Sequence, residues 1–406
     1  PFFLITGPFL SDLSVSLICI LFLLYCVREK NFSYFKNKYF YFFLFFCGYL
    51  ILNSLINNLE SVGTSMVYVR YGIFVIAIGA LLSSDDRFIK YFFYCILICF
   101  TVLITDGFYQ YFVGENILGY RTSNYFRVSS FFHDELILGS YLSRLWPIFF
   151  GLSILIFKKE NKFFLFLIII FIFSEALIFL SGERSAFFYI NLSAVFVILF
   201  SHKLAKLRLL TLLSSIFVIA LISFINPLAK ERIIDQSLRS MNIVNSEQGE
   251  EPNREAKDRQ FYIFTKAHHD LYTSAYMMFL DNKIIGVGVK NFRNVCSEQK
   301  YYVDNEQKCS THPHNAFIQI LAETGLIGLS FLLVVVFYFF KYILKHLIFK
   351  YNSKYYFTDF EICILSGIII YLWPIVPTLN FFNNWINIAM IINIPFLIWS
   401  RKLNKS

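Results

Sequence analysis

Long uninterrupted apolar segments recur along this sequence, and they restrict the possible fold more than any other feature. A helix needs about 20 mostly apolar residues to cross the hydrocarbon core of a bilayer. Because the apolar residues run continuously and do not alternate with polar ones, the sequence predicts helices and not the strands of a barrel. We expect eleven spanning helices, at 7–27, 39–57, 64–83, 90–111, 136–157, 163–181, 185–200, 207–226, 315–340, 360–379 and 382–399.

The composition agrees with a membrane protein. The chain is 57% hydrophobic and 16% charged, with a mean hydropathy of +0.59. Soluble proteins carry about 25% charged residues. The composition as a whole excludes disordered, collagen-like and disulfide-framework proteins. An all-α polytopic membrane protein is therefore expected. Pro1 and Pro8 resemble the end of an interrupted helix, which leads us to expect about twelve spans in the intact protein.

Lysine and arginine residues are distributed unevenly between the short connections. More than half of the 36 basic residues, with Lys203, Lys206 and Arg208 among them, fall in alternate connections, which marks these connections as cytoplasmic. The one long connection then lies outside. The net charge of +9 is mostly this asymmetry, with some attraction to membrane lipids, and it does not indicate nucleic-acid binding. We expect one membrane domain with helices in 1–226, an outside loop at 227–313, and further helices in 314–406.

Two of the eight cysteines, Cys296 and Cys309, lie in the outside loop. In an oxidising compartment they can form a disulfide, and the alternative is a pair of free thiols. The remaining cysteines fall in the spans, where the side chain usually packs as a small apolar group. No cysteine and histidine spacing is typical of a zinc site, so no metal is expected.

The same loop contains an amphipathic segment at 271–280, LYTSAYMMFL. It predicts a short helix that either lies in the membrane interface or packs on a small core of the loop itself. Gly286 and Gly288 follow and allow a tight turn. A lone Gly-x-Gly is weak evidence for a phosphate-binding loop.

The segment 311–330, THPHNAFIQILAETGLIGLS, carries the strongest functional signal. His312 and His314 stand at the outer membrane surface, and histidine accepts a proton near neutral pH. Gln319 and Glu323, one helical turn apart, continue the polar face into the span. Polar groups at such depth cost free energy unless they face protein or water, so the pattern predicts a functional site.

This segment resembles the signature of the O-antigen ligase and polymerase superfamily of bacterial inner-membrane glycosyltransferases. The ligase signature is His, then Asn, Ser or Gln, nine residues, and Gly-x-x-Gly. The resemblance covers most of the chain and implies a membrane glycosyltransferase of the GT-C type. The matching positions are His314, Asn315, residues 316–324, Gly325 and Gly328, and the segments 127–147, 181–186 and 281–293 resemble other blocks of the family.

The resemblance implies a glycan donor linked to undecaprenyl diphosphate. Ligases of this superfamily join the glycan to lipid A–core, whereas polymerases join it to a second lipid-linked glycan. The nine-residue spacing favours the ligase, and the polymerase remains the close alternative. Neither metal nor ATP nor another cofactor is implied, because a lipid diphosphate is already an activated leaving group.

The resemblance also assigns roles to individual residues. His314 would take the proton from the acceptor hydroxyl. The departing diphosphate suits arginine, whose planar fork binds two oxygens at once. Arg184, in a short outside turn, is the first candidate, with an interfacial anchor as its alternative role. Further substrate contacts are expected from Arg127, Arg259, His312, Asn315 and His268, the last at a position where many members carry arginine.

Four charged residues lie within or at the ends of predicted spans and allow a different interpretation. Secondary transporters also place ionisable residues inside the membrane. The four lie mostly toward the outer ends of their spans, near the surface that carries His314, and we find no internal repeat. A transporter is therefore the alternative from another class. These residues are Arg70, Arg144, Glu175 and Glu323.

Overall fold

The computed structural model describes residues 1–121, 127–157, 162–225, 231–235, 238–239, 265–303, 309–352, 354–375 and 379–403. Every regular element in these ranges is a helix, so the chain is an all-α polytopic membrane protein. Nine helices in the described part are long and apolar enough to cross a membrane: Pro8–Arg28 (α1), Lys38–Asn57 (α2), Leu59–Ser84, Arg87–Val113 (α5), Leu138–Ile156 (α6), Lys162–Leu180 (α7), Ala205–Ile225 (α9), Ala316–Tyr351 (α14) and Asn384–Leu403.

Two of these nine spans are assembled from shorter helices. Leu59–Ser84 includes α3 (Val62–Val67) and α4 (Arg70–Ser84), and Asn384–Leu403 joins α16 (Asn384–Ile391) to α17 (Asn393–Leu403). Pro395 lacks the N–H group that would bond to the Ile391 carbonyl, which explains the second break. At the same break, the Asn393 side chain donates to Ala389 O at 3.3 Å and Met390 O at 3.2 Å.

Two of the eleven expected spans correspond to shorter helices. The segment 185–200 forms α8 (Arg184–Phe200), and 360–379 forms α15 (Asp359–Leu372). Helix α15 ends where Trp373 precedes Pro374, and the residue before a proline is disfavoured in a helix. Almost all of α15 is buried, because it packs against α6 and α8. Its apolar side chains therefore pack in the protein interior.

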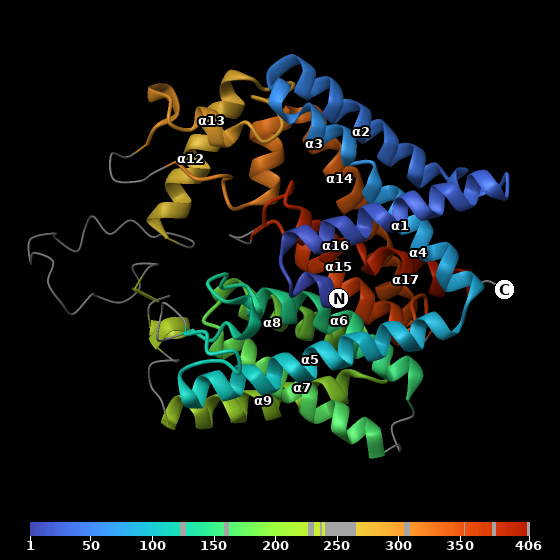
Figure 1. Ribbon diagram of the computed structural model, residues 1–406, viewed down its shortest axis with the longest axis vertical. Coiled ribbons are helices and arrows are strands. Elements are labelled where there is room, and N and C mark those ends of the chain that lie inside the picture. The colour runs from blue at the N-terminus through green and yellow to red at the C-terminus, as the bar shows by residue number, and fades with distance from the viewer. Residues whose placement is uncertain are drawn as a thin grey trace, which may run out of the picture.

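The helices form two groups in Figure 1. Helices α5 to α9 lie together in its lower half, and α1 to α3 lie in the upper half beside α14, with α15 to α17 between them. Helix α6 is central to the lower group, since every residue from Leu138 to Ser153 is buried. A polar side chain on α6 therefore faces protein or a cavity.

The long loop contributes three short helices that pack near the start of α14. These are α12 (Lys266–Asp281), α13 (Phe292–Val295) and η7 (Gln299–Tyr301). Of the two placements considered for the amphipathic segment, the structure shows the packed one, although Tyr276 and Leu280 remain exposed. The small core consists of Ala275, Met278, Val287, Phe292, Cys296, Tyr301 and Ala322.

Candidate active site

A break in α14 holds the long loop in place. Gly325 interrupts the helix with φ 62° and ψ −163°. Segment 283–288 lies against this break, and Val287 N donates to Ala322 O at 2.9 Å. A Cβ atom on Gly325 would collide with the carbonyl of Ile284. Gly325 of the Gly-x-x-Gly signature therefore permits close backbone packing, whereas a Cβ atom on Gly328 would meet the side chain of Thr324.

Glu323 fastens the same loop through its side chain. Its carboxylate accepts hydrogen bonds from Lys290 N and Phe292 N, both at 3.1 Å, and from Gln319 Nε2 at 3.2 Å. Gln319 Oε1 in turn accepts from Phe381 N at 2.8 Å. The polar face predicted on this helix thus faces protein, and it connects α14 to two loops.

His314 directly precedes α14, and Asn315 caps the helix. Asn315 Oδ1 accepts from Phe317 N at 2.9 Å and from Ile318 N at 3.1 Å, while its Nδ2 donates to Pro374 O at 2.7 Å. Asn315 does not line the cavity described next, and its observed contacts are those of a helix cap. His314 takes φ 58°, which is uncommon for a residue with a Cβ atom.

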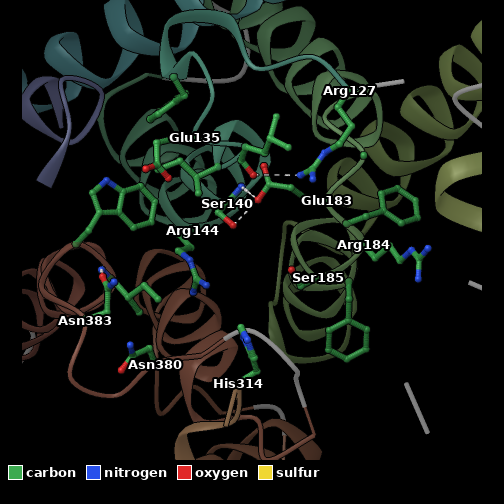
Figure 2. Close-up of a pocket in the computed structure, with 18 of the residues that line it drawn as sticks. Arg127, Glu135, Ser140, Arg144, Glu183, Arg184, Ser185, His314, Asn380 and Asn383 are labelled. Atoms are coloured by element: carbon green, nitrogen blue, oxygen red, sulfur yellow. Dashed lines mark hydrogen bonds between the residues drawn. The ribbon is translucent and has the colours of Figure 1, made fainter. Parts of the chain in front are cut away.

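A cavity of about 1370 Å³ opens beside His314. Its walls come from the start of α1, the segment before α6, the turn between α7 and α8, the start of α12, Ile375, and residues 380–386. Figure 2 shows part of this lining. Five of the predicted site residues line this one cavity: Arg127, Arg184, His268, His312 and His314.

Three histidines form a cluster in this lining. The ring centroid of His314 lies 5.7 Å from that of His268 and 4.2 Å from that of His312. Burial lowers the pKa of His314, and burial followed by repulsion from His314 lowers the pKa of His268 to about 4 and of His312 to about 3. All three are neutral at pH 7. His314 can accept a proton, whereas His268 does not replace the permanent charge of an arginine.

Arg127 and Glu183 fasten the turn between α7 and α8 to its neighbours. Arg127 donates from Nε to Ser181 O at 3.0 Å and from Nη2 to Leu136 O at 3.1 Å. The Glu183 carboxylate accepts from Ser140 N at 3.0 Å and from Ser140 Oγ at 2.6 Å (Figure 2). Burial raises the pKa of Glu183 to about 7, against these donors. Two donors of Arg127 are thus used in positioning the cavity wall.

Arg184 begins α8, directly after the predicted short turn. The chain reverses at Gly182, whose φ is 67°. Arg184 lies close enough to His268 to contribute to the low pKa of that imidazole. Arg259, the other predicted phosphate ligand, lies outside the described residues.

Of the four charged residues predicted within spans, only Arg144 lines the cavity. Two others form ion pairs, Arg70 with Asp12 at 2.6 Å and Glu175 with Arg208 at 2.7 Å. Arg208 belongs to the basic residues at 203–208 that indicated a cytoplasmic connection, and the structure buries it within α9. Arg144 is absent from the predicted substrate-binding residues, although its position in the segment 127–147 was a usable signal.

The structure joins Cys296 and Cys309 in a disulfide, with Cα atoms 5.6 Å apart. Cys296 follows α13 and is buried in the small core of the loop. Cys309 lies on the segment that leads to His314. The bond would therefore restrain the approach to the histidine cluster.

A comparison of the sequence with protein families found a match. Residues 164–333 match the family model described as O-Antigen ligase. This match supports the O-antigen ligase and polymerase superfamily. The matched superfamily region holds Arg184, His268, His312 and His314, and it begins after α6. No curated protein matched the chain.

Proposed function

We propose that this protein is an O-antigen ligase that transfers a glycan from undecaprenyl diphosphate to lipid A–core at the periplasmic face of the bacterial inner membrane. The observation that carries the proposal is the cavity in which a neutral His314 lies with Arg184. Both residues fall within the part of the chain that matches the family.

The lining suits a donor that is both charged and lipid-linked. Arg184 lies in the same wall as the apolar side chains of Phe187 and Phe188, and Ile386 adds apolar surface from α16. A lipid diphosphate presents an anionic group directly attached to a hydrocarbon chain. The mixed lining therefore supports this donor class better than a free sugar.

The proposed reaction is a direct displacement. His314 takes the proton from an acceptor hydroxyl, whose oxygen forms a bond to the anomeric carbon of the glycan. The bond between that carbon and the diphosphate breaks, and the diphosphate leaves with the bonding electrons. General base catalysis of this kind supplies on the order of 10²–10⁴-fold. Arg184 stabilises the charge that develops on the leaving group. We propose that the reaction requires no metal.

The identity of the acceptor separates ligase from polymerase. Purified protein in liposomes is given a lipid-diphosphate glycan donor, with lipid A–core present in one arm and only additional donor in the other. Glycan on lipid A–core supports the ligase, and longer lipid-linked chains support the polymerase. Donor binding without any product in either arm would contradict a transferase and favour a transporter.

A further inference from the structure

Arg144 is a buried cation without a counter-charge. The residue is 1% exposed, and it lines the cavity from α6. Nε and Nη1 have no hydrogen-bond partner, and no carboxylate in the described ranges forms an ion pair with it. An uncompensated buried charge is strongly unfavourable. The fold therefore keeps Arg144 at a cost that no ion pair in the described ranges offsets.

The guanidinium is nevertheless held in a fixed position. It lies over two aromatic rings, 4.6 Å from the centroid of Tyr189 on α8 and 4.8 Å from that of Tyr371 on α15. Such contacts hold the plane of the guanidinium while leaving its N–H groups available. In Figure 2, Arg144 on α6 and His314 on the segment before α14 extend toward the same space.

Arg208 shows how this fold treats a buried arginine with a structural role. Its side chain is 0% exposed, and Nη1 lies 2.7 Å from the Glu175 carboxylate and 3.0 Å from Thr211 Oγ1. Both arginines lie over aromatic rings, since Arg208 lies 4.3 Å from the ring of Trp146. The difference between them is the carboxylate. Arg144 lacks one and faces the cavity, which is the arrangement expected of a residue that receives an anion from outside the protein.

We propose that Arg144 binds the diphosphate of the lipid-linked donor inside the cavity, across from His314. This inference rests on the proposed function. Two parallel N–H groups of a guanidinium match two phosphate oxygens, and exclusion of water strengthens the attraction. Arg184 then supplies a second cation from the neighbouring helix. Arg144 lies outside residues 164–333, so the helices before the matched region would contribute to the substrate site.

The test compares matched variants of the two buried arginines in the full-length protein. Arg144→Met, Arg144→Lys and Arg208→Met are purified in detergent, and Tm is measured with and without inorganic pyrophosphate. We expect pyrophosphate to raise the Tm of the wild type and to have almost no effect on Arg144→Met. Arg144→Lys should keep part of the shift. Without pyrophosphate, Arg144→Met should equal or exceed the wild-type Tm, whereas Arg208→Met should lower it by leaving Glu175 buried without its partner.

The transfer assay shows which substrate Arg144 binds. Arg144→Met should raise the KM for the lipid-diphosphate donor at least about tenfold, the size expected when hydrogen bonds to a charged group are lost. The KM for the acceptor should stay unchanged. A higher acceptor KM alone, or wild-type donor KM together with a wild-type pyrophosphate shift, would overturn the assignment.

The two proposals fail in different ways. If the wild type transfers no glycan but its pyrophosphate shift depends on Arg144, the result supports the anion site and contradicts the glycosyltransferase function. If wild type and Arg144→Met transfer glycan with the same donor KM, the function stands and the role of Arg144 falls. The exposed Arg121→Gln controls for the loss of one positive charge and should leave the shift intact.

Discussion

The two walls of the cavity are held by different forces. The wall with Arg127, Arg144 and Arg184 is built on helices α6 to α8, which are fixed by buried apolar packing and by the Glu183 contacts with α6. The wall with the histidines belongs to a loop whose own core is small. That loop is fixed by backbone pairing at Gly325 and by the Glu323 hydrogen bonds.

This difference separates the two chemical tasks. In the proposed function the arginines bind the charge of the donor, and packed helices give them fixed positions. The proposed base, His314, lies on a loop that is clamped to one helix at a few points. Changes in the clamp should therefore abolish activity while leaving the membrane bundle intact. Changes in the arginine wall should weaken substrate binding in a graded way.

The largest effect after loss of the base itself is expected from the loop clamp. Gly286 has φ 70°, and a Cβ atom there would lie 2.5 Å from the Glu323 carbonyl carbon. Gly286→Val should destabilise the docked loop by about 3 kcal/mol or more and reduce transfer to background. Proteolysis of the loop and a glycan-transfer assay would measure both effects.

Gly48, in α2, provides the control for that experiment. Nothing lies within 4 Å of a Cβ atom placed there. Gly48→Ala should therefore keep full activity and loop protection. Wild-type activity in Gly286→Val would show that the clamp does not position the site.

A smaller effect is expected in the arginine wall. Arg184→Lys keeps the charge but loses the bidentate fork, so the transfer rate should fall about tenfold, in line with the loss of one charged hydrogen bond. Initial rates at saturating acceptor would measure this change. An unchanged rate would favour the interfacial-anchor role for Arg184.

The pH dependence of stability should differ between the two walls, because the cluster of three imidazoles lies in only one of them. The folded-state pKa values of His268, about 4, and His312, about 3, lie below the ordinary value of 6.5. Their contribution to loop stability is complete above pH 6.5 and is lost as the pH falls toward these values. Loop proteolysis from pH 7.5 to 4 should show loosening only on the acid side.

Transfer activity should also fall on the acid side, because His314 must be neutral to act as a base. Burial lowers the pKa of His314. The acid limb of the rate profile should lie below pH 6.5. Glu183, with a pKa of about 7, titrates nearby. Glu183→Gln therefore serves as the control, and an acid limb that disappears in this variant would contradict the assignment to His314.

The smallest effect is expected from the disulfide. Removing a bond that closes a short loop costs about 3 kcal/mol, and here other contacts also hold the loop. Cys296→Ser with Cys309→Ser should leave measurable transfer and lower only the loop's resistance to proteolysis. Mass spectrometry of the unreduced peptide would show whether the bond forms. Free thiols in the native protein would contradict the pairing.

The sequence was sufficient to predict most helices and to single out His312 and His314, because apolar length and the segment around His314 are local features. It could not predict which helices stop short. The end of α15 depends on Trp373 and Pro374 and on burial by α6 and α8. Apolar content alone does not distinguish a buried helix from a spanning one.

Local sequence patterns also could not predict which side chains contact one another. Asn315 matches the family signature, yet its amide caps α14, which an asparagine before a helix also predicts. The sequence predicted Arg208 as part of a cytoplasmic connection, whereas in the structure it forms an ion pair with Glu175 on α7. Arg144 and His314 are far apart along the chain, so only the folded structure places them in one lining.

The most direct test of the account is glycan transfer by His314→Ala in liposomes, with a lipid-diphosphate donor and both acceptors. The variant should remain folded, with a wild-type Tm response to pyrophosphate, and should transfer at least about 10²-fold more slowly, as expected for loss of a general base. Wild-type transfer by a correctly folded His314→Ala protein would contradict the central claim.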